Sequence, residues 1–433
     1  MTFRKIIRFW LRFFSHWYII KYQPIVIGIT GNTGKTSTKE AIHQVLKQKG
    51  ILLRKTLKNL NTDIGVPLAI LGLGDARRNI IKWLYNFLKA LLLVIHDKKP
   101  PKYLILELAA DRPGEIEYFT NFLPIKIGVV TTIGKDPVHL EFFPNRDGLI
   151  DEKSWIVRGV QEKGTIILNR DDKDVIAMGK LAKDKTKILS YGKTPNSDLL
   201  ILDHRSFLAK DTKFYTEVKF KFQNQIYHLK LPDAMGKGNL YSAMPALLCG
   251  FILGISIKDG IEALQEEVFL PPGRMKIIKG IKETTIIDDT YNASPLSYHN
   301  ALTSIADIDV CKGRKILIMG DMAEIGKRSL DIHKEILEYA LNFANNIICL
   351  GEQMTSALSS INLTKSDFVR LPKINIAKNH QEAINITKQL ARKGDMILVK
   401  GAQVMRMEKI VKALMKSPDQ AKTLLVRQEK HWN

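Results

Sequence analysis

The chain has 433 residues, 45% of them hydrophobic, and exceeds the size at which a single core usually stops growing, so two or three globular domains are expected. Its 66 Lys and Arg against 44 Asp and Glu leave a net charge of +22, which favours anionic partners such as nucleotides, nucleic acid or an anionic membrane surface without choosing among them. The sequence has neither an apolar run of the roughly 18 to 20 residues needed to span a bilayer nor a secretory cleavage site, and its three cysteines are far apart, so we expect a cytoplasmic protein.

The N-terminal segment, residues 1–23, is predicted to contain a basic amphipathic helix over Phe3–Tyr18. Large apolar side chains recur there at steps of three and four residues. The cations among them are Arg4, Lys5, Arg8 and Arg12. Such a helix either lies flat on an anionic membrane surface or packs against its own domain. The pattern leaves both alternatives open, so contact of residues 3–18 with the inner membrane face is one expectation.

A phosphate-binding loop follows the strand predicted at Ile25–Thr30. Its residues are Gly31, Asn32, Thr33, Gly34, Lys35, Thr36 and Ser37. Backbone N–H groups of a glycine-rich turn at the start of a helix bind phosphate oxygens, and the helix dipole favours the anion. We expect Lys35 to reach the terminal phosphates of a nucleotide and Thr36 to bind a magnesium ion. Because Ile29 stands where the full eight-residue pattern has a glycine, the loop is a shortened form of that pattern.

Apolar runs typical of strands follow at Tyr103–Leu108, Ile125–Thr131 and Thr165–Leu168. Helical stretches lie between the strands, and a second amphipathic helix beside basic residues is predicted over Arg77–His96. Strands that alternate with helices are typical of a mostly parallel sheet with crossover helices. The fold class is therefore predicted to be α/β.

A domain boundary is predicted at Pro271-Pro272-Gly273, where turn residues interrupt the chain. A new set of strands follows at Thr285–Ile287, Lys315–Met319, Asn346–Leu350 and Met396–Val399. We therefore expect a central nucleotide-binding domain with a parallel sheet over residues 24–272 and a C-terminal Rossmann-like domain over residues 273–433.

Three side chains outside the loop are candidates for chemistry. Glu107 ends a predicted strand and would lie at the carboxyl edge of the sheet, where ligands bind in open α/β folds. A hard cation there needs carboxylate oxygen, although a strand-end Glu is a helix cap or a surface residue as often as a metal ligand. His139 follows another strand and would supply an imidazole to the same region. Lys153 is a lone lysine on a predicted helix, for which a solvated side chain is the default.

The candidates belong to a series of stretches that occur in one order along the chain. They are Gly31–Glu40, Asn59–Pro67, Glu107–Ile116, His139–Glu141 with Asp151–Lys153, Asn169–Asp172, Gly273-Arg274, Asp288–Pro295 and Gly320–Gly326. Their order and spacing resemble the Mur ligase family, and within it the branch that adds D-alanyl-D-alanine to a UDP-linked muramyl tripeptide. The resemblance extends roughly from Ile25 to Val411.

The resemblance implies a role for each matching position. Lys35 would contact the phosphates of ATP, and Thr36, Glu107 and His139 would surround Mg²⁺. Lys153 matches a lysine that is carbamylated in this family, which turns a cation into an anion that helps to hold a second metal. Arg274 and Asp289 would close on the nucleotide from the C-terminal domain. The remaining expected nucleotide contacts are Gly31, Asn32, Thr33, Gly34, Ser37, Asn169 and Asn292.

The implied reaction is the ATP-dependent formation of an amide bond in peptidoglycan precursor synthesis. A muramyl-peptide carboxylate would attack the γ-phosphate of ATP, and Mg²⁺ and Lys35 would offset the repulsion between the two anions. The amine of an amino acid or dipeptide would then attack the acyl phosphate and release phosphate. Catalysis would rest on Lys35, Lys153, His139 and Arg274. We expect a monomer. We expect no nucleic-acid partner, because only the net charge favours one.

The sequence also departs from the family pattern. The phosphate loop starts about thirty residues from Met1, whereas the family opens with a domain that binds the UDP-sugar and has the size of a small domain. Gly238 stands where a histidine is common, and Ser242 where an asparagine meets the adenine. Ala402 and Gln403 replace a serine and an arginine. A P-loop ATP-binding protein, or an inactive relative of the ligases acting at the membrane surface, is therefore the alternative hypothesis.

Overall fold

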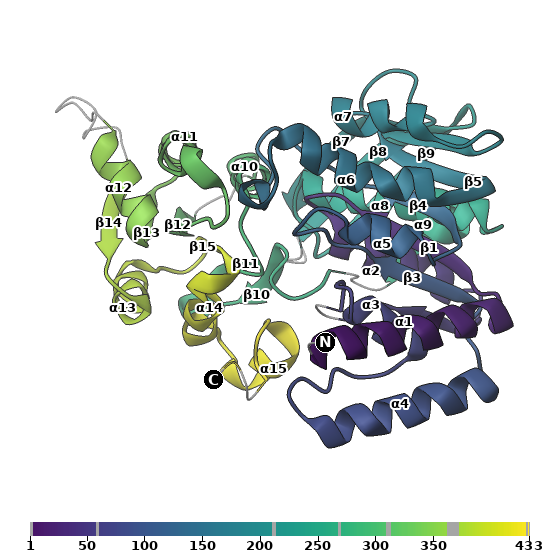
Figure 1. Ribbon diagram of the computed structural model, residues 1–433. Helices are drawn as coiled ribbons and strands as arrows, with labels where there is room; N and C mark the ends of the chain where they lie inside the picture. Colours follow the sequence, from purple (N-terminus) through teal and green to yellow (C-terminus); the bar gives the residue numbers. More distant parts are fainter. Residues whose placement is uncertain are drawn as a thin grey trace.

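The computed structural model describes residues 3–57, 60–209, 214–266, 270–308, 313–361, 372–429 and 432. Asn59, the first residue of one predicted motif, lies outside the described residues. The described chain forms two β-sheets with helices on both faces, and the two sheets lie side by side (Figure 1).

The first sheet has nine strands in the order β2-β3-β1-β4-β5-β6-β7-β8-β9. Its strands are β1 Ile25–Thr30, β2 Leu53–Lys55, β3 Tyr103–Glu107, β4 Ile125–Val130, β5 Val160–Asn169, β6 Lys187–Gly192, β7 Leu199–Leu208, β8 Phe214–Phe222 and β9 Gln225–Pro232. All neighbours from β2 to β7 pair in parallel, and β7, β8 and β9 pair antiparallel. The carboxyl ends of β1, β3, β4 and β5 therefore meet at one edge of the sheet.

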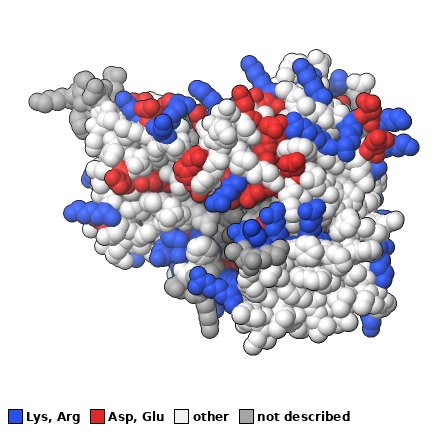
Figure 2. Space-filling model, in the orientation of Figure 1, with Lys and Arg blue, Asp and Glu red and all other residues white. Residues whose placement is uncertain are grey.

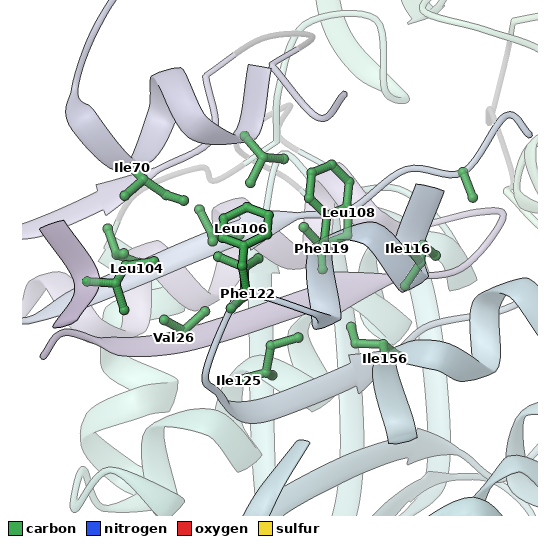
Figure 3. Packing of buried hydrophobic residues seen from close by; sticks show 14 of the residues in the cluster. Val26, Ile70, Leu104, Leu106, Leu108, Ile116, Phe119, Phe122, Ile125 and Ile156 are labelled. Carbon is green, nitrogen blue, oxygen red and sulfur yellow. The ribbon is translucent and has the colours of Figure 1, made fainter. Parts of the chain in front are cut away.

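Helices cover both faces of this sheet. They are α1 Phe3–Tyr22, α2 Lys35–Lys47, α3 Gly65–Leu71, α4 Ile80–Ile95, α5 Glu115–Thr120, α6 Arg146–Gly159, α7 Lys173–Ala177, α8 Lys237–Ile252 and α9 Ile257–Glu266. On one face, Ile70 of α3, Phe119 of α5 and Ile156 of α6 belong to one buried cluster with Leu104 and Leu106 of β3, in which Ile156 lies beside Ile125 of β4 (Figure 3). A second cluster joins the other face to α2, α8 and α9. Because the central strands are buried on both faces, their sequences are continuous apolar runs.

The second sheet has six strands in the order β10-β11-β15-β12-β13-β14. Its strands are β10 Lys276–Lys279, β11 Thr285–Asp289, β12 Lys315–Gly320, β13 Asn346–Leu350, β14 Lys373–Ala377 and β15 Met396–Lys400. The edge strand β10 is antiparallel to β11, and all other neighbours are parallel. Its helices are α10 Pro295–Ala306, α11 Ser329–Leu341, α12 Glu352–Ser360, α13 His380–Leu390, α14 Glu408–Leu414 and α15 Ala421–Leu424.

The predicted α/β class with a mostly parallel sheet is confirmed. Each predicted strand is present, although β5 begins at Val160, five residues before the expected start at Thr165. The antiparallel strands β7 to β9 were not predicted. Alternating exposed and buried residues along β8 explain this, because the sheet is covered on one face only there and the apolar run is broken.

The N-terminal helix α1 packs on its own domain along one face only. Ile7, Leu11 and Tyr18 are buried on this face, and Ser15 donates a hydrogen bond to the carbonyl oxygen of Pro67 at 3.3 Å. The opposite face carries exposed aromatic side chains, among them Trp10. Within the described ranges, no helix combines the length and the apolar character needed to cross a membrane.

Candidate active site

The phosphate loop joins β1 to α2 at the carboxyl edge of the first sheet. Gly31 has φ +136° and Gly34 has φ +91°, conformations that L-residues rarely adopt. A Cβ atom at Gly31 would lie 2.1 Å from Oγ1 of Thr131, so only glycine fits there. The backbone N–H of Asn32 donates to the carbonyl oxygen of Thr132 at 2.7 Å, and Oγ1 of Thr131 donates to that of Thr33 at 2.8 Å. The end of β4 therefore fixes the shape of the loop.

Lys35 is folded back over this loop. Its Nζ donates to the carbonyl oxygens of Gly31 at 2.8 Å and Asn32 at 3.2 Å. Burial lowers the pKa of Lys35 below its usual range, and the nearby Glu107 carboxylate opposes that shift. These hydrogen bonds hold the ammonium group near the place where a phosphate would bind. Phosphate oxygens are stronger partners for an ammonium group than carbonyl oxygens are, so a bound phosphate would replace them.

Thr36 and Glu107 form the pair that suits a hard cation. Oγ1 of Thr36 donates to Oε1 of Glu107 at 3.1 Å, which places a hydroxyl and a carboxylate beside the loop. Oε2 of Glu107 is buried, accepts no hydrogen bond from the described residues, and lies 3.4 Å from Nζ of Lys39. A buried carboxylate oxygen without a hydrogen-bond donor is a fitting ligand for Mg²⁺, which also keeps water and phosphate oxygens in its shell.

His139 lies at the border between the two sheets. Its Nε2 is 3.5 Å from Oδ1 of Asp111, and its Nδ1 is 2.6 Å from Oε2 of Glu324, which follows β12. Burial lowers the pKa of His139 to about 4, so the imidazole is neutral at pH 7, as a metal ligand must be. Within the described part of the chain, no three His, Cys, Asp or Glu side chains are grouped as a ready-made metal site.

Lys153 is buried on α6 rather than solvated, contrary to the default for a lone helical lysine. Burial, and then the positive charge of Lys35, lowers the pKa of Lys153 to about 7. A substantial share of its amine is therefore neutral at pH 7, and a neutral amine is the form that reacts with carbon dioxide.

A cavity of about 250 Å³ brings most of these side chains together. From the first sheet it is lined by Asn32, Thr33, Lys35, Asn61, Glu107, Ala109, Ala110, Asp111, Val138, His139 and Lys153, and from the second by Arg274, Tyr291, Asn292, Ser294, Ser297 and Gln403. The guanidinium of Arg274 stacks over the ring of Tyr291 at 4.1 Å. We call this space the reaction chamber, because the phosphate loop and the second sheet face each other across it.

A second cavity of about 890 Å³ adjoins the same loop, with Thr33 lining both. Its lining includes Gly34, Asn169, Tyr191, Gly238, Tyr241 and Ser242. Nδ2 of Asn169 donates to Oγ1 of Thr132 at 2.9 Å, so Asn169 braces the turn that shapes the phosphate loop. We call it the nucleoside cavity, since it is large enough for a nucleoside and leads to the phosphate loop.

Four predicted nucleotide contacts line neither cavity: Gly31, Thr36, Ser37 and Asp289. Asp289 accepts a hydrogen bond from Nζ of the buried Lys400 at 2.5 Å and from the backbone N–H of Met275 at 3.2 Å. Ser37 is buried at the start of α2. In this conformation the carboxylate of Asp289 is occupied by donors of its own domain, Lys400 and the backbone of Met275.

Sequence reasoning missed some residues that support the chamber. Arg427 donates through its guanidinium to the carbonyl oxygens of Thr290 and Tyr291 and forms a buried ion pair with Glu408 at 2.9 Å. It thereby holds the segment that carries Tyr291 and Asn292 into the chamber. No sequence signal indicates this role, because Arg427 lies 136 residues after Tyr291 and belongs to no motif.

Comparisons with known proteins agree with this geometry. Residues 29–250 match the Mur ligase middle domain and residues 273–403 match the glutamate ligase domain of Mur ligases. The UDP-N-acetylmuramoyl-tripeptide–D-alanyl-D-alanine ligase of Bacillus subtilis is 27% identical over 402 residues, which are 93% of this chain and 78% of that protein. The ligase of the same name from Escherichia coli is 26% identical, over 90% of this chain and 76% of its own.

Solved structures share the fold. MurF from Acinetobacter baumannii matches with a TM-score of 0.76 and 24% identity, over 94% of this chain and 80% of its own. MurF from Thermotoga maritima in complex with ADP matches with the same score and identity, over 95% and 84%. The motif resemblance is therefore confirmed, and the chain belongs to the Mur ligase family of ATP-dependent ligases.

Proposed function

We propose that this protein uses ATP to activate a substrate carboxylate as an acyl phosphate and then joins it to an amine as an amide. The single observation that carries the proposal is the reaction chamber, in which Lys35 and Glu107 of the first sheet face Arg274 of the second. Residues 24–272 would form the ATP-binding domain, and residues 273–433 the Rossmann-like domain that closes on it.

The residues of the chamber supply the groups that this reaction needs. Lys35 would exchange its two loop carbonyls for phosphate oxygens of ATP, and Arg274 would stabilise the charge that spreads over the transferred phosphoryl group. Asn169 and the loop residues Gly31 to Ser37 would place the nucleotide. Closure of the second domain over the chamber would also keep water away from the acyl phosphate, which water would otherwise hydrolyse.

Thr36, Glu107 and His139 would hold Mg²⁺, together with Lys153 once that lysine is carbamylated. The ion would supply positive charge that lets two anions approach each other. The hydrogen bond from Thr36 to Glu107 and the pKa of Lys153 near 7 support these assignments. Asp289 would reach the nucleotide only after closure, since it is bound to Lys400 in the present conformation, whereas Asn292 already lines the chamber.

The substrates proposed are a muramyl peptide that supplies the carboxylate and D-alanyl-D-alanine that supplies the amine, for peptidoglycan synthesis. The names of the relatives support this choice. Gln403 lines the chamber where the family pattern has an arginine. We therefore expect recognition of the amine substrate to differ from the family pattern more than the other steps do.

We also propose that the protein is a monomer whose residues 3–18 make peripheral contact with a membrane. The support is the exposed face of α1, where Phe9, Trp10 and Phe13 are each more than 40% exposed. Aromatic side chains on one face of a basic helix are typical of helices that lie in the membrane interface.

Phosphate release tests the ligase proposal. Purified protein with ATP and magnesium is assayed against muramyl peptides combined with amino acids or dipeptides. Release that requires both substrates is expected, and Lys35→Ala should reduce it by about a hundredfold or more without lowering the melting temperature, because the hydrogen bonds of Lys35 to described residues go to its own loop. Lys187→Ala, on an exposed lysine at the start of β6, is the matched control. ATP hydrolysis that ignores every substrate pair would reject the ligase reaction.

A further inference from the structure

Helix α4 is apolar on the face that it exposes. Eight large hydrophobic side chains on this face have exposed fractions between 43% and 79%. They are Ile80, Ile81, Leu84, Tyr85, Leu88, Leu91, Leu92 and Ile95. Only Trp83, Asn86 and Ala90 are buried. A surface helix of a globular protein normally exposes polar residues and buries its apolar stripe, so α4 is the reverse of the usual arrangement.

The exposed apolar residues of the described chain gather on α4 and α1. Of 26 exposed large hydrophobic side chains, eight are on α4 and seven on α1, although the two helices comprise only 36 residues. The seven on α1 are Phe3, Ile6, Phe9, Trp10, Phe13, Trp17 and Ile20. Contiguous exposed apolar patches beyond a few hundred Å² are rare on monomers and mark interaction sites.

The two helices form one surface. Tyr22 donates through its hydroxyl to the carbonyl oxygen of Leu93 at 3.1 Å, and the hydroxyl of Tyr18 donates to Asp97 at 2.6 Å. The carboxyl ends of α1 and α4 therefore lie together, and Figure 1 shows both helices side by side below the first sheet. Figure 2 shows the lower right of the molecule, where they lie, as a broad uncharged area with Lys and Arg at its border.

The charges around this surface select an anionic partner. Neither α1 nor α4 contains an Asp or a Glu. Lys82 and Lys89 border the apolar stripe of α4, and Lys5 lies on α1. Lysine stems reach past apolar surface while the ammonium groups stay at the polar level.

The arginines of α1 contribute less to this border than the sequence pattern indicated. Arg4 is 3.0 Å from Asp63, and Arg8 is 3.7 Å from the same carboxylate. The guanidinium groups of Arg8 and Arg12 also lie over the ring of Tyr118. The ring contacts therefore hold Arg8 and Arg12 against the protein, whereas Arg4 stays 71% exposed beside Asp63 and, with the lysines, carries charge at the border of the apolar area.

We propose that α1 and α4 together form a docking surface for an anionic lipid bilayer, with α4 inserted at the level of the headgroups and the first acyl carbons. The inference extends the proposed membrane contact of residues 3–18 to a second helix that no motif assigns. A pair of helices with Trp and Tyr among aliphatic side chains, and lysines at the border, matches the composition of interfacial helices. At 16 residues and about 1.5 Å per residue, α4 would lie along the surface for about 24 Å, too short to cross it.

Co-sedimentation with vesicles tests this surface. The full chain is mixed with vesicles of phosphatidylcholine alone, or with phosphatidylglycerol added. We expect binding that needs the anionic lipid and weakens with salt. The double variant Leu84→Gln and Leu88→Gln should weaken partitioning by about tenfold or more, because two aliphatic side chains leave the interface. Its melting temperature should match wild type, since these side chains are 63% and 59% exposed.

Matched variants separate the possible outcomes. Leu202→Gln with Ile226→Gln changes two exposed apolar residues of β7 and β9 and should leave partitioning unchanged. Normal partitioning of the α4 variant, with loss only in Trp10→Gln and Trp17→Gln, would restrict the contact to α1 and overturn the inference. A dimer in light scattering that the α4 variant dissociates, without vesicle binding by wild type, would assign the face to a second copy and overturn it too. Phosphate release in the same samples without vesicles reports the ligase proposal separately, so its absence beside intact vesicle binding would reject that proposal alone.

Discussion

At the scale of single residues, Lys153 shows how burial prepares a side chain for chemistry. The lysine belongs to α6 and lines the reaction chamber beside Lys35, whose charge disfavours a second ammonium group. In a proposed site for phosphates and metal ions, the uncharged amine of Lys153 can take part in metal binding once carbamylation has turned it into an anion. The low pKa is thus the physical link between the fold and the proposed carbamate.

We expect Lys153→Met to stabilise the protein at pH 7 by about 1 kcal/mol or more in buffer free of carbon dioxide, and to remove most ligase activity. The pKa is about 7 in the folded state and about 10.4 when unfolded, so between these values the unfolded chain holds a proton that the folded chain does not. Wild-type stability therefore rises with pH across this window. The advantage of the variant should be full below pH 7 and shrink toward pH 10. Denaturant unfolding at several pH values measures it, and a pH-independent difference would contradict the assignment.

At the scale of elements, the phosphate loop depends on a backbone shape that one methyl group would destroy. Gly31→Ala should lower the free energy of unfolding by about 2–4 kcal/mol and abolish nucleotide binding, because φ +136° is strained for alanine and its Cβ would collide with Thr131. Thermal unfolding and titration with an ATP analogue measure the two effects. Gly74→Ala, where an added Cβ meets nothing within 4 Å, is the control. Wild-type affinity in the Gly31 variant would show that the loop does not hold the phosphates.

The first turn of α8 offers room for the histidine that the family usually has. A Cβ at Gly238 would meet nothing within 4 Å, and the residue lines the nucleoside cavity. We expect Gly238→His to lower the KM for ATP several-fold, because an imidazole would add contacts to the base, and to gain about 0.3–0.5 kcal/mol of helix stability. Gly238→Ala should also stabilise the helix but leave the KM for ATP unchanged. Equal KM values for the two variants would place the adenine elsewhere.

The sequence predicted the positions of the strands better than it predicted which side chains contact each other. The buried strands before Gly31 and up to Glu107 were predictable, because strands covered on both faces need continuous apolar residues. The strands β7 to β9 were not, since one solvated face breaks that signal. Pairings such as Asp289 with Lys400 join residues 111 positions apart, and only the parallel register of β11 with β15 brings them together.

At the scale of the whole molecule, the phosphate-loop side of the first sheet meets the second through polar contacts at Asp136 and His139 and through Val138, which is buried in the core of the second sheet. Arg328 is paired with Oδ1 of Asp136 at 2.5 Å, and the backbone N–H of His139 donates to the carbonyl oxygen of Glu324 at 3.1 Å. The Arg328 side chain is 49% exposed, so the pair contributes at most about 1 kcal/mol. An ion pair this weak breaks easily, as the reaction requires if the chamber opens for each new substrate.

We therefore expect Arg328→Ala to increase the radius of gyration of the ligand-free protein. A loss of about 1 kcal/mol shifts the closed-to-open ratio about fivefold, and a saturating ATP analogue with acceptor should restore the compact form. Small-angle scattering measures both states. Arg205→Ala, which breaks an exposed pair within the first sheet, should leave the profile unchanged. Identical profiles for the Arg328 variant and wild type, with and without ligand, would argue against closure through this contact.

The attachment of Arg427 to the carbonyl oxygens of Thr290 and Tyr291 also has a consequence for biosynthesis. A ribosome makes Tyr291 136 residues before it makes Arg427, so the wall of the chamber emerges long before its support. At typical elongation rates of about 5–20 residues per second, that delay lasts roughly 7–27 seconds. A nascent chain can fold its phosphate loop during this time, but it can complete the chamber only when the last helices have been made.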